Sequence, residues 1–275
     1  MNPHAKPSLS IMYLAHSMWM NRSLTVQMIR REVAGRYKGS IMGLTWSFLN
    51  PILMLAVYTF VFSVVFKARW AGGSESKTEF ALVLFSGLIL FNLFSECVNK
   101  APTLILSNVN YVKKVIFPLE ILPVINLGAA LFHWMISLLV WLVFYCIFYG
   151  VPHLTVLLLP IVMLPLVVLS LGMSWLLASL GVYLRDVAQV VGVLMSVLMF
   201  LSPIFYPVSS LPSEYQVIML INPLTLAIEQ ARDIMMWGKM PDWVSWSKYL
   251  VISGVFSWFC FAWFQKTRKG FADVL

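Results

Sequence analysis

Long runs of hydrophobic residues, separated by short polar segments, make up most of the chain from residue 44 onward. A helix needs about 20 apolar residues to cross roughly 30 Å of hydrocarbon. Continuous runs near this length predict an all-α integral membrane protein, because a β-barrel would show short alternating segments instead. We expect one transmembrane domain over residues 44–265, with six helices at about 44–66, 80–98, 121–149, 154–184, 187–201 and 248–264.

Two segments depart from this pattern. Residues 1–43 are polar and basic, and between Trp19 and Tyr37 apolar and basic side chains alternate, which predicts an amphipathic helix in the membrane interface. Residues 203–246 contain five prolines, and their uncharged run over 215–228 is too short to cross a bilayer. We expect this segment to be re-entrant, at the outer mouth of the protein and just before the last helix.

Basic residues are distributed unevenly over the two faces that six spans would create. The face with both termini carries 13 of the 19 lysines and arginines, in residues 1–43, 100–120, 185 and 266–275. The other face carries six, and with acidic residues included the net charges are +8 and 0. The positive-inside rule therefore predicts a cytoplasmic location for both termini, with the chain in the cytoplasmic (inner) membrane.

The composition narrows the class of protein further. Hydrophobic residues make up 60% of the 275 positions and charged residues 11%, against about 25% charged in soluble domains. This excludes a water-soluble enzyme and a disordered chain. The basic excess follows the topology, so we expect contact with membrane lipids and no nucleic-acid partner. The three cysteines show neither a disulfide framework nor metal-ligand spacing.

Sequence features of catalysis are missing from the chain. It has no G-x-x-x-x-G-K-[ST] phosphate loop, no Ser/His/Asp set and no paired histidines. The predicted spans carry charges only at their ends, apart from His133, which we interpret as a packing residue rather than a proton relay. We therefore expect no enzyme activity, no metal and no cofactor in this chain, and an energy source outside it.

Three motifs follow one another along the chain. They are Arg30-Arg31-Glu32 with Arg36-Tyr37-Lys38-Gly39-Ser40 and Asn50-Pro51, then Asn110-Tyr111-Val112-Lys113-Lys114-Val115-Ile116-Phe117-Pro118, and Asn222-Pro223-Leu224-Thr225. In this order they resemble the membrane subunit of ABC-2 type exporters. The resemblance is greatest to the polysaccharide branch, which moves O-antigen, capsule or teichoic acid.

The resemblance implies a half-transporter that works as a homodimer with two copies of a separate ATP-binding subunit, which holds ATP and Mg²⁺. Its cargo would be a lipid-linked polysaccharide such as O-antigen or capsule. Three alternatives stay open: teichoic acid as the cargo, a permease of the same fold for a small amphiphile such as a drug or lipid, and a membrane scaffold without transport.

Two basic segments are candidate sites at the cytoplasmic face. The resemblance implies that residues 100–120 dock on the ATPase; their polar and aromatic candidates are Asn110, Tyr111, Lys113, Lys114 and Phe117. The alternative is a charged loop against lipid headgroups. In the N-terminal helix, Arg30, Arg31, Arg36 and Lys38 suit a lipid-linked pyrophosphate, or they merely anchor the helix in the interface.

Aromatic side chains are candidates for the channel lining. Tyr58, Phe62 and Phe66 repeat every four residues, so they share one helix face, and Phe48 lies close to it. With Phe205 and Tyr206 at the outer mouth, they would offer flat surfaces to the apolar faces of sugar rings. The alternative is packing against lipid or other helices. Glu229 and Arg232, three residues apart, form a predicted structural pair.

Overall fold

The computed structural model describes residues 10–65, 77–113 and 117–275, and over these ranges it contains helices and no strand. The α-helices are α1 (Ile11–Met20), α2 (Arg22–Arg36), α3 (Trp46–Tyr58), α4 (Lys77–Lys100), α5 (Val109–Lys113), α6 (Leu122–Tyr149), α7 (Leu159–Val162), α8 (Leu164–Tyr183), α9 (Val187–Phe200), α10 (Ser213–Ile221), α11 (Pro223–Met236), α12 (Trp243–Thr267) and α13 (Phe271–Val274). The prediction of an all-α chain is confirmed for the described residues.

Five helical stretches of the described chain are long and apolar enough to cross a membrane. They are Gly43–Phe62, Thr78–Thr103, Leu119–Tyr149, Leu154–Tyr183 and Trp243–Val274. They coincide with five of the six predicted spans, although the end of the first prediction, at Phe66, lies outside the described residues. The remaining predicted span is α9, an apolar helix of 14 residues. At 1.5 Å per residue it is about 21 Å long, less than the hydrocarbon thickness.

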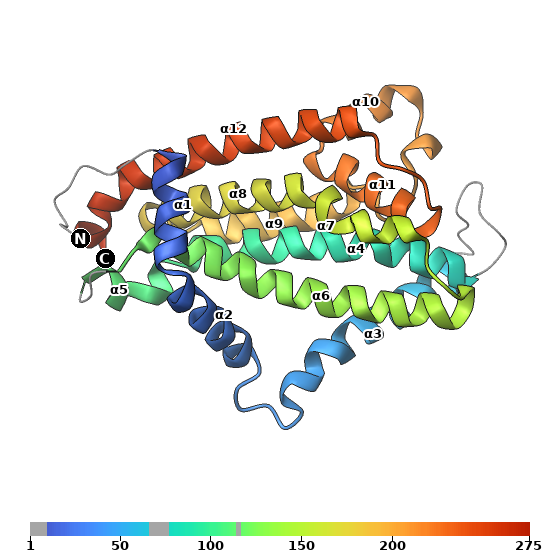
Figure 1. Ribbon diagram of the computed structural model, residues 1–275, viewed down its shortest axis with the longest axis horizontal. Helices are drawn as coiled ribbons and strands as arrows, with labels where there is room; N and C mark the ends of the chain where they lie inside the picture. The colour runs from blue at the N-terminus through green and yellow to red at the C-terminus, as the bar shows by residue number, and fades with distance from the viewer. Residues whose placement is uncertain (1–9, 66–76, 114–116) are drawn as a thin grey trace.

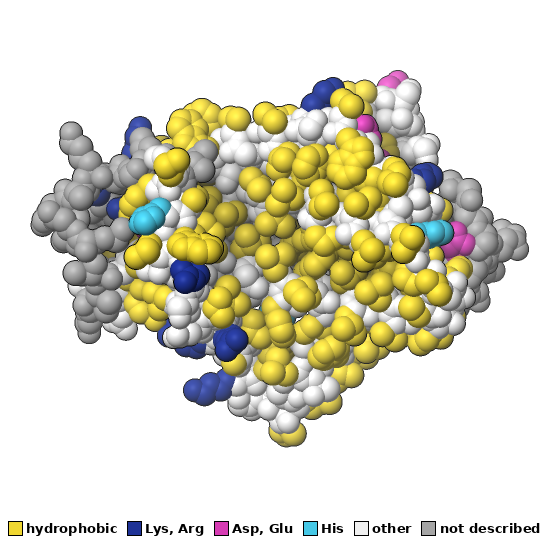
Figure 2. Space-filling view, viewed as in Figure 1, with side chains coloured by type: hydrophobic (Ala, Val, Ile, Leu, Met, Phe, Trp, Pro, Cys, Tyr) yellow, Lys and Arg dark blue, Asp and Glu magenta, His cyan; other side chains and the backbone are white. Residues whose placement is uncertain are grey.

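The helices α4, α6, α8, α9 and α12 run side by side along the long axis of the molecule (Figure 1). The stretch containing α4 is the core of this bundle, since 83% of its most apolar window is buried. The stretch containing α3 is only 11% buried. Figure 2 shows hydrophobic side chains covering most of one face of the bundle, while most basic side chains visible there surround α1 and α2. Such a surface suits lipid, which solvates exposed apolar side chains.

Small residues bring the helix backbones close together. A Cβ atom added at Gly172 on α8 would lie 2.7 Å from the Cα atom of Ser257 on α12. One added at Gly181 would lie 1.9 Å from the carbonyl oxygen of Pro102. Helices in membranes associate through this kind of close packing rather than through the hydrophobic effect. Glycine is therefore required at both positions.

The N-terminal helices form a V beside the bundle (Figure 1). The first arm, α2, packs on α6, where the side chain of Ile29 occupies the space that a side chain at Gly128 would need. The second arm is α3. Between them the chain reverses at Gly39 and Gly43, whose φ angles of 86° and 50° are readily adopted only by glycine.

Residues 203–246 include the short α-helices α10 and α11, which lie at the end of the bundle opposite to α1, α5 and α13 (Figure 1). Asn222 separates them and caps α11, because its side-chain oxygen accepts a hydrogen bond from the backbone of Leu224 at 2.9 Å. Pro223 occupies the first turn of α11, where its missing N–H costs nothing. The helix α10 is largely exposed, whereas α11 packs against α4 and α7.

Candidate functional site

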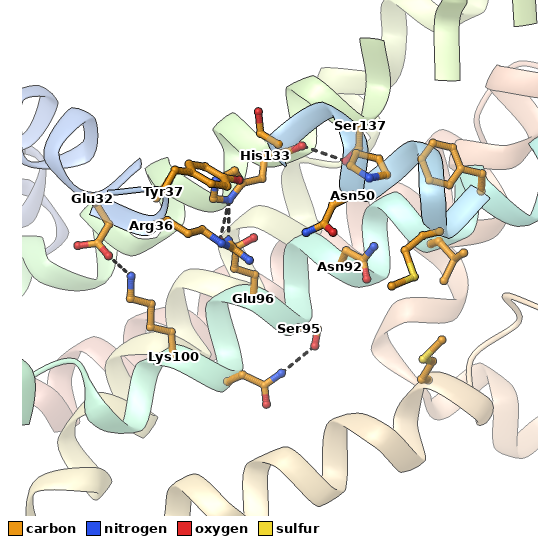
Figure 3. Close-up of a pocket in the computed structure, with 18 of the residues that line it drawn as sticks. Glu32, Arg36, Tyr37, Asn50, Asn92, Ser95, Glu96, Lys100, His133 and Ser137 are labelled. Carbon is orange, nitrogen blue, oxygen red and sulfur yellow. Dashed lines mark hydrogen bonds and ion pairs between the residues drawn. The ribbon is translucent and has the colours of Figure 1, made fainter. Parts of the chain in front are cut away.

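A cavity of about 870 Å³ lies between α2, α3, α4 and α6 (Figure 3). Its volume falls within the usual range for ligand sites, about 300–1,000 Å³. The polar residues in its wall are Glu32, Arg36, Tyr37, Ser47, Asn50, Asn92, Ser95, Glu96, Asn99, Lys100, His133 and Ser137. Polar groups are expensive inside an apolar helix bundle, so a gathering of this size makes the cavity the candidate functional site.

The helical period explains how α4 supplies a larger share of this wall than any other helix. Asn92, Ser95, Glu96 and Asn99 are spaced by three or four residues, so they lie on one face of the helix. Residues 80–91 of α4 are buried in the bundle, and nearly all of them are apolar. The three- and four-residue spacing of this polar stripe can be read from the sequence, although the sequence analysis did not single it out.

Ion pairs join the walls of the cavity. Arg36 on α2 pairs with Glu96 on α4, with 2.6 Å between Nη1 and Oε1. The same Glu96 oxygen lies 2.8 Å from Nδ1 of His133 on α6. Lys100 on α4 pairs with Glu32 on α2. Together these contacts fix α2 against α4 and α6, so the position of α2 determines the shape of the cavity.

An aromatic cluster lies beside the cavity. Tyr58 forms part of the cavity wall and its ring is 6.0 Å from that of Phe205. Phe62 stacks on Phe205 at 4.9 Å, and Phe200 stacks on the same ring at 5.7 Å. Phe80 completes the cluster, 6.4 Å from Phe62. The structure thus brings three predicted channel residues together from two segments distant in sequence.

The other predicted channel residues behave differently. Phe48 is exposed on α3 and is not part of the cavity wall. The hydroxyl group of Tyr206 donates a hydrogen bond to the carbonyl oxygen of Phe200 at 2.8 Å, which places Tyr206 beside the cluster. Burial raises the pKa of this hydroxyl. Phe66 lies outside the described residues.

The four basic candidates on the N-terminal segment differ in their contacts. Arg36 contributes to the cavity through its ion pair with Glu96. Arg31 points the other way and donates a hydrogen bond from Nη1 to the hydroxyl oxygen of Tyr111, at 3.0 Å. Arg30 and Lys38 are exposed.

The predicted docking segment contains a short helix, α5, whose Tyr111 stacks on Phe117. The rings of Tyr111 and Phe117 are stacked at 4.5 Å with an interplanar angle of 18°. Asn110 and Lys113 are exposed on α5, and Lys114 lies outside the described residues. The segment therefore presents polar side chains on an aromatic support, an arrangement suited to docking on another protein.

Glu120 is a polar junction that sequence reasoning missed. Its carboxylate is fully buried and accepts hydrogen bonds from Ser17 at 3.1 Å and Tyr13 at 3.4 Å, both on α1. Arg268, which follows α12, pairs with it at 3.0 Å. Burial, with the charge of Glu120 second, raises the pKa of Tyr13. One carboxylate thus joins α1, the docking segment and the C-terminal end of the chain.

Arg232 is fully buried at the opposite end of the bundle. Its guanidinium group donates hydrogen bonds to the carbonyl oxygens of Pro203 at 2.8 Å and Val83 at 3.3 Å. Burial lowers the pKa of Arg232 to about 10, against the raising effect of nearby Glu229 and Asp233. Burial also raises the pKa of Glu229, which Arg232 in turn lowers. The structural pairing of Glu229 with Arg232 stays a prediction.

The described residues contain no group of three or more His, Cys, Asp or Glu side chains placed to hold a metal ion. The chemistry that the cavity offers is therefore hydrogen bonding from amides and hydroxyls, with paired charges at one side.

Comparison with known proteins identifies the family. Residues 23–236 match the model of the ABC-2 type transporter family. The chain is 28% identical over 264 residues to the O-antigen export system permease protein RfbA of Myxococcus xanthus, covering 95% of this chain and 99% of that protein. It is 26% identical to the protein of that name from Klebsiella pneumoniae, covering 92% and 95%.

A third relative carries a different polymer in its name. The polysialic acid transport protein KpsM of Escherichia coli is 25% identical over 236 residues, covering 84% of this chain and 89% of that protein. The family match extends over most of the chain, including α2 to α11 and the whole cavity wall. This chain belongs to the ABC-2 type transporter family.

Proposed function

We propose that this chain is the membrane subunit of an ATP-driven exporter that moves a polysaccharide, such as O-antigen or capsule, across the cytoplasmic membrane. The observation that carries the proposal is the polar cavity next to an aromatic cluster, inside an otherwise apolar bundle. The names of the relatives, which are O-antigen and polysialic acid transport proteins, support the same cargo class. The chain is a permease subunit and not an enzyme.

The two parts of the site suit the two sides of a sugar. Amides and hydroxyls of Asn50, Asn92 and Ser95 both donate and accept hydrogen bonds, as sugar hydroxyls do. Aromatic rings such as those of Tyr58 and Phe205 offer flat apolar faces for the C–H faces of pyranose rings. Because each contact is weak, a polymer would slide past them without being trapped.

The membrane arrangement that we propose has six spans with both termini in the cytoplasm. Its support is the contact of α1 and Arg268 through Glu120, which puts both ends of the described chain at one end of the bundle. The excess of basic residues at that end agrees with a cytoplasmic location. The helix α9 would be the sixth span, and α10 and α11 would form the re-entrant region at the outer mouth.

The partners that we propose are a second copy of this chain and two ATP-binding subunits, which hold ATP and Mg²⁺. Only 11% of the most apolar window in the stretch containing α3 is buried, so this surface is accessible for packing against a second copy of the chain. The exposed residues Asn110 and Lys113 would dock on the ATPase. Movement of the docking segment would reach α2 through Arg31 and Tyr111, and the cavity through Glu32 and Arg36 on the same helix.

The lipid that carries the polysaccharide would bind through its pyrophosphate to the solvent-exposed basic side chains on and just after α2. Arg30 and Lys38 are exposed and suit this role. Arg31 and Arg36 already have partners in Tyr111 and Glu96, so they would contribute only after these contacts open.

Reconstitution tests the proposed function directly. The permease and its ATPase would be purified together in lipid nanodiscs, and ATP hydrolysis measured with and without lipid-linked glycan from the host. We expect stimulation by the glycan, and loss of surface polysaccharide when the gene is deleted. Unchanged hydrolysis together with an intact surface polysaccharide would contradict the proposal.

A small amphiphile is the second candidate cargo. The cavity volume of about 870 Å³ lies in the range of drug-sized ligand sites and favours this candidate. Stimulation of the same complex by an alkyl phospholipid or a drug, and not by glycan, would establish it.

A further inference from the structure

The charges in the cavity wall balance one another. The acidic and basic side chains in the cavity wall are Glu32, Arg36, Glu96, Lys100 and His133. Two cations face two carboxylates, in the pairs Arg36 with Glu96 and Lys100 with Glu32. His133 adds its Nδ1 atom to Glu96. Each cation in the cavity wall is therefore neutralised by a carboxylate beside it.

The remaining polar wall is uncharged. The amides of Asn50 on α3 and Asn92 on α4 project into the same part of the cavity (Figure 3). Their side chains make no hydrogen bond with the described residues. They are thus ready to bind hydroxyl groups of a ligand, since an amide offers donors and an acceptor together.

An anionic polymer would meet an electrostatic obstacle here. A carboxylate or phosphate that leaves water for an apolar bundle must be paired with a cation. An anionic ligand that pairs with Arg36 or Lys100 would compete with Glu96 or Glu32 for the same cation and would lie close to a like charge, which is unfavourable. An uncharged sugar requires only hydrogen bonds and exacts no such cost.

We propose that this cavity selects uncharged glycan segments, and that Glu32 and Glu96 enforce the choice by neutralising Lys100 and Arg36. This inference rests on the proposed function and specifies its cargo. It distinguishes the chain from its relative named for polysialic acid, a polymer of acidic sugars.

Two soluble probes of equal length test the proposal. Maltoheptaose is uncharged, and the seven-residue oligogalacturonate carries a carboxylate on each ring. Each would compete with the host's lipid-linked glycan for stimulation of ATP hydrolysis by the complete complex in nanodiscs, at pH 8 and fixed salt. We expect maltoheptaose to compete at a concentration at least about tenfold lower than oligogalacturonate.

Charge variants make the test specific. Glu96→Gln frees Arg36, and we expect it to shift the preference about tenfold or more towards oligogalacturonate. The double variant Arg36→Gln with Glu96→Gln removes the cation together with the carboxylate, so the cavity wall is again neutral. It retains glutamine at position 96 but should lose the new preference for oligogalacturonate. Glu214→Gln, at an exposed position on α10, is the matched control and should leave the preference unchanged.

Each result tests a different part of the proposal. Equal competition by the two probes, or better competition by oligogalacturonate with the unaltered complex, would overturn the selectivity. A preference that Glu96→Gln leaves unchanged would overturn the role of the carboxylates. If neither probe competes although lipid-linked glycan stimulates hydrolysis, the cavity does not recognise sugar and the inference fails alone. If lipid-linked glycan gives no stimulation, the proposed function fails with it.

Discussion

Arg31 on α2 donates a hydrogen bond from Nη1 to the hydroxyl oxygen of Tyr111 on α5, at 3.0 Å across 80 residues of sequence. The guanidinium carbon also lies 6.0 Å from the centre of the Tyr111 ring. This contact connects the segment expected to dock on the ATPase with the helix that borders the cavity. It offers a direct mechanical route between the two.

Removing this hydrogen bond should weaken coupling. Tyr111→Phe keeps the ring stacked on Phe117 but deletes the hydroxyl acceptor. We expect basal ATP hydrolysis to persist and glycan-stimulated hydrolysis to fall roughly two- to tenfold. This range corresponds to about 0.5–1.5 kcal/mol, the usual net contribution of one hydrogen bond. Tyr215→Phe, exposed on α10, is the control and should change neither rate. Equal loss of both rates would indicate a folding defect rather than uncoupling.

The Glu120 junction should matter for stability. Glu120→Ala leaves Arg268 partly buried without its partner and removes the acceptor for Tyr13 and Ser17. We expect the free energy of unfolding to fall by about 3 kcal/mol. This lies in the lower part of the range for broken buried ion pairs, because Arg268 retains some solvent contact. Thermal unfolding in detergent would measure it, and protease cleavage before α2 would report release of α1. An unchanged melting temperature would contradict the role of this junction.

The aromatic cluster should depend on aromatic faces and not on volume alone. Phe205→Leu largely keeps the packing among Tyr58, Phe62 and Phe200 but removes a flat ring. We expect near-normal thermal stability, within about 1.5 kcal/mol, and reduced export of polysaccharide, measured as surface polymer per cell. Phe48→Leu is the matched control, because Phe48 is exposed and outside the cavity wall. Equal export by the two variants would argue that the rings only pack.

The N-cap of α12 gives a prediction about pH. Hydrogen bonds from Ser245, first from its side chain and then from its backbone, lower the pKa of Asp242 below its ordinary value. Because the folded-state pKa is below the unfolded one, the stabilisation is complete above about pH 4 and is lost as the pH falls through the folded pKa. Asp242→Ala should therefore lower the melting temperature at pH 7 and have little effect near pH 2. A difference that is constant over this range would exclude the ionised cap as its cause.

The sequence predicted those features that depend on local pattern. Hydrophobic runs located five of the spans because length and apolarity alone decide whether a helix suits a bilayer. The four-residue spacing of Tyr58 and Phe62 correctly placed them on one face. The α9 helix was predicted at nearly its observed bounds, but it is shorter than the five candidate spans, so its role as a sixth span stays a proposal.

The features that escaped prediction depend on packing between distant segments. The stripe around Asn92 on α4 was readable, but only the approach of α2 and α3 turns it into the wall of a cavity. The partners of Glu120 lie 103 and 148 residues away, so nothing near it in sequence indicated a buried junction. Arg31 and Arg36 looked equivalent in sequence, yet they face different partners because α2 lies between the docking segment and the cavity.

Protection of a cysteine at Asn92 tests the central claim most directly. In a background with Cys97, Cys146 and Cys260 replaced by serine, Asn92→Cys places a thiol in the cavity wall, and Lys248→Cys places an exposed thiol on α12. Both would be labelled with a small maleimide before and during export of lipid-linked glycan by the complete complex. We predict that glycan slows labelling at position 92 at least about tenfold and leaves position 248 unchanged. Equal labelling rates at position 92 with and without glycan would show that the polymer does not pass through this cavity.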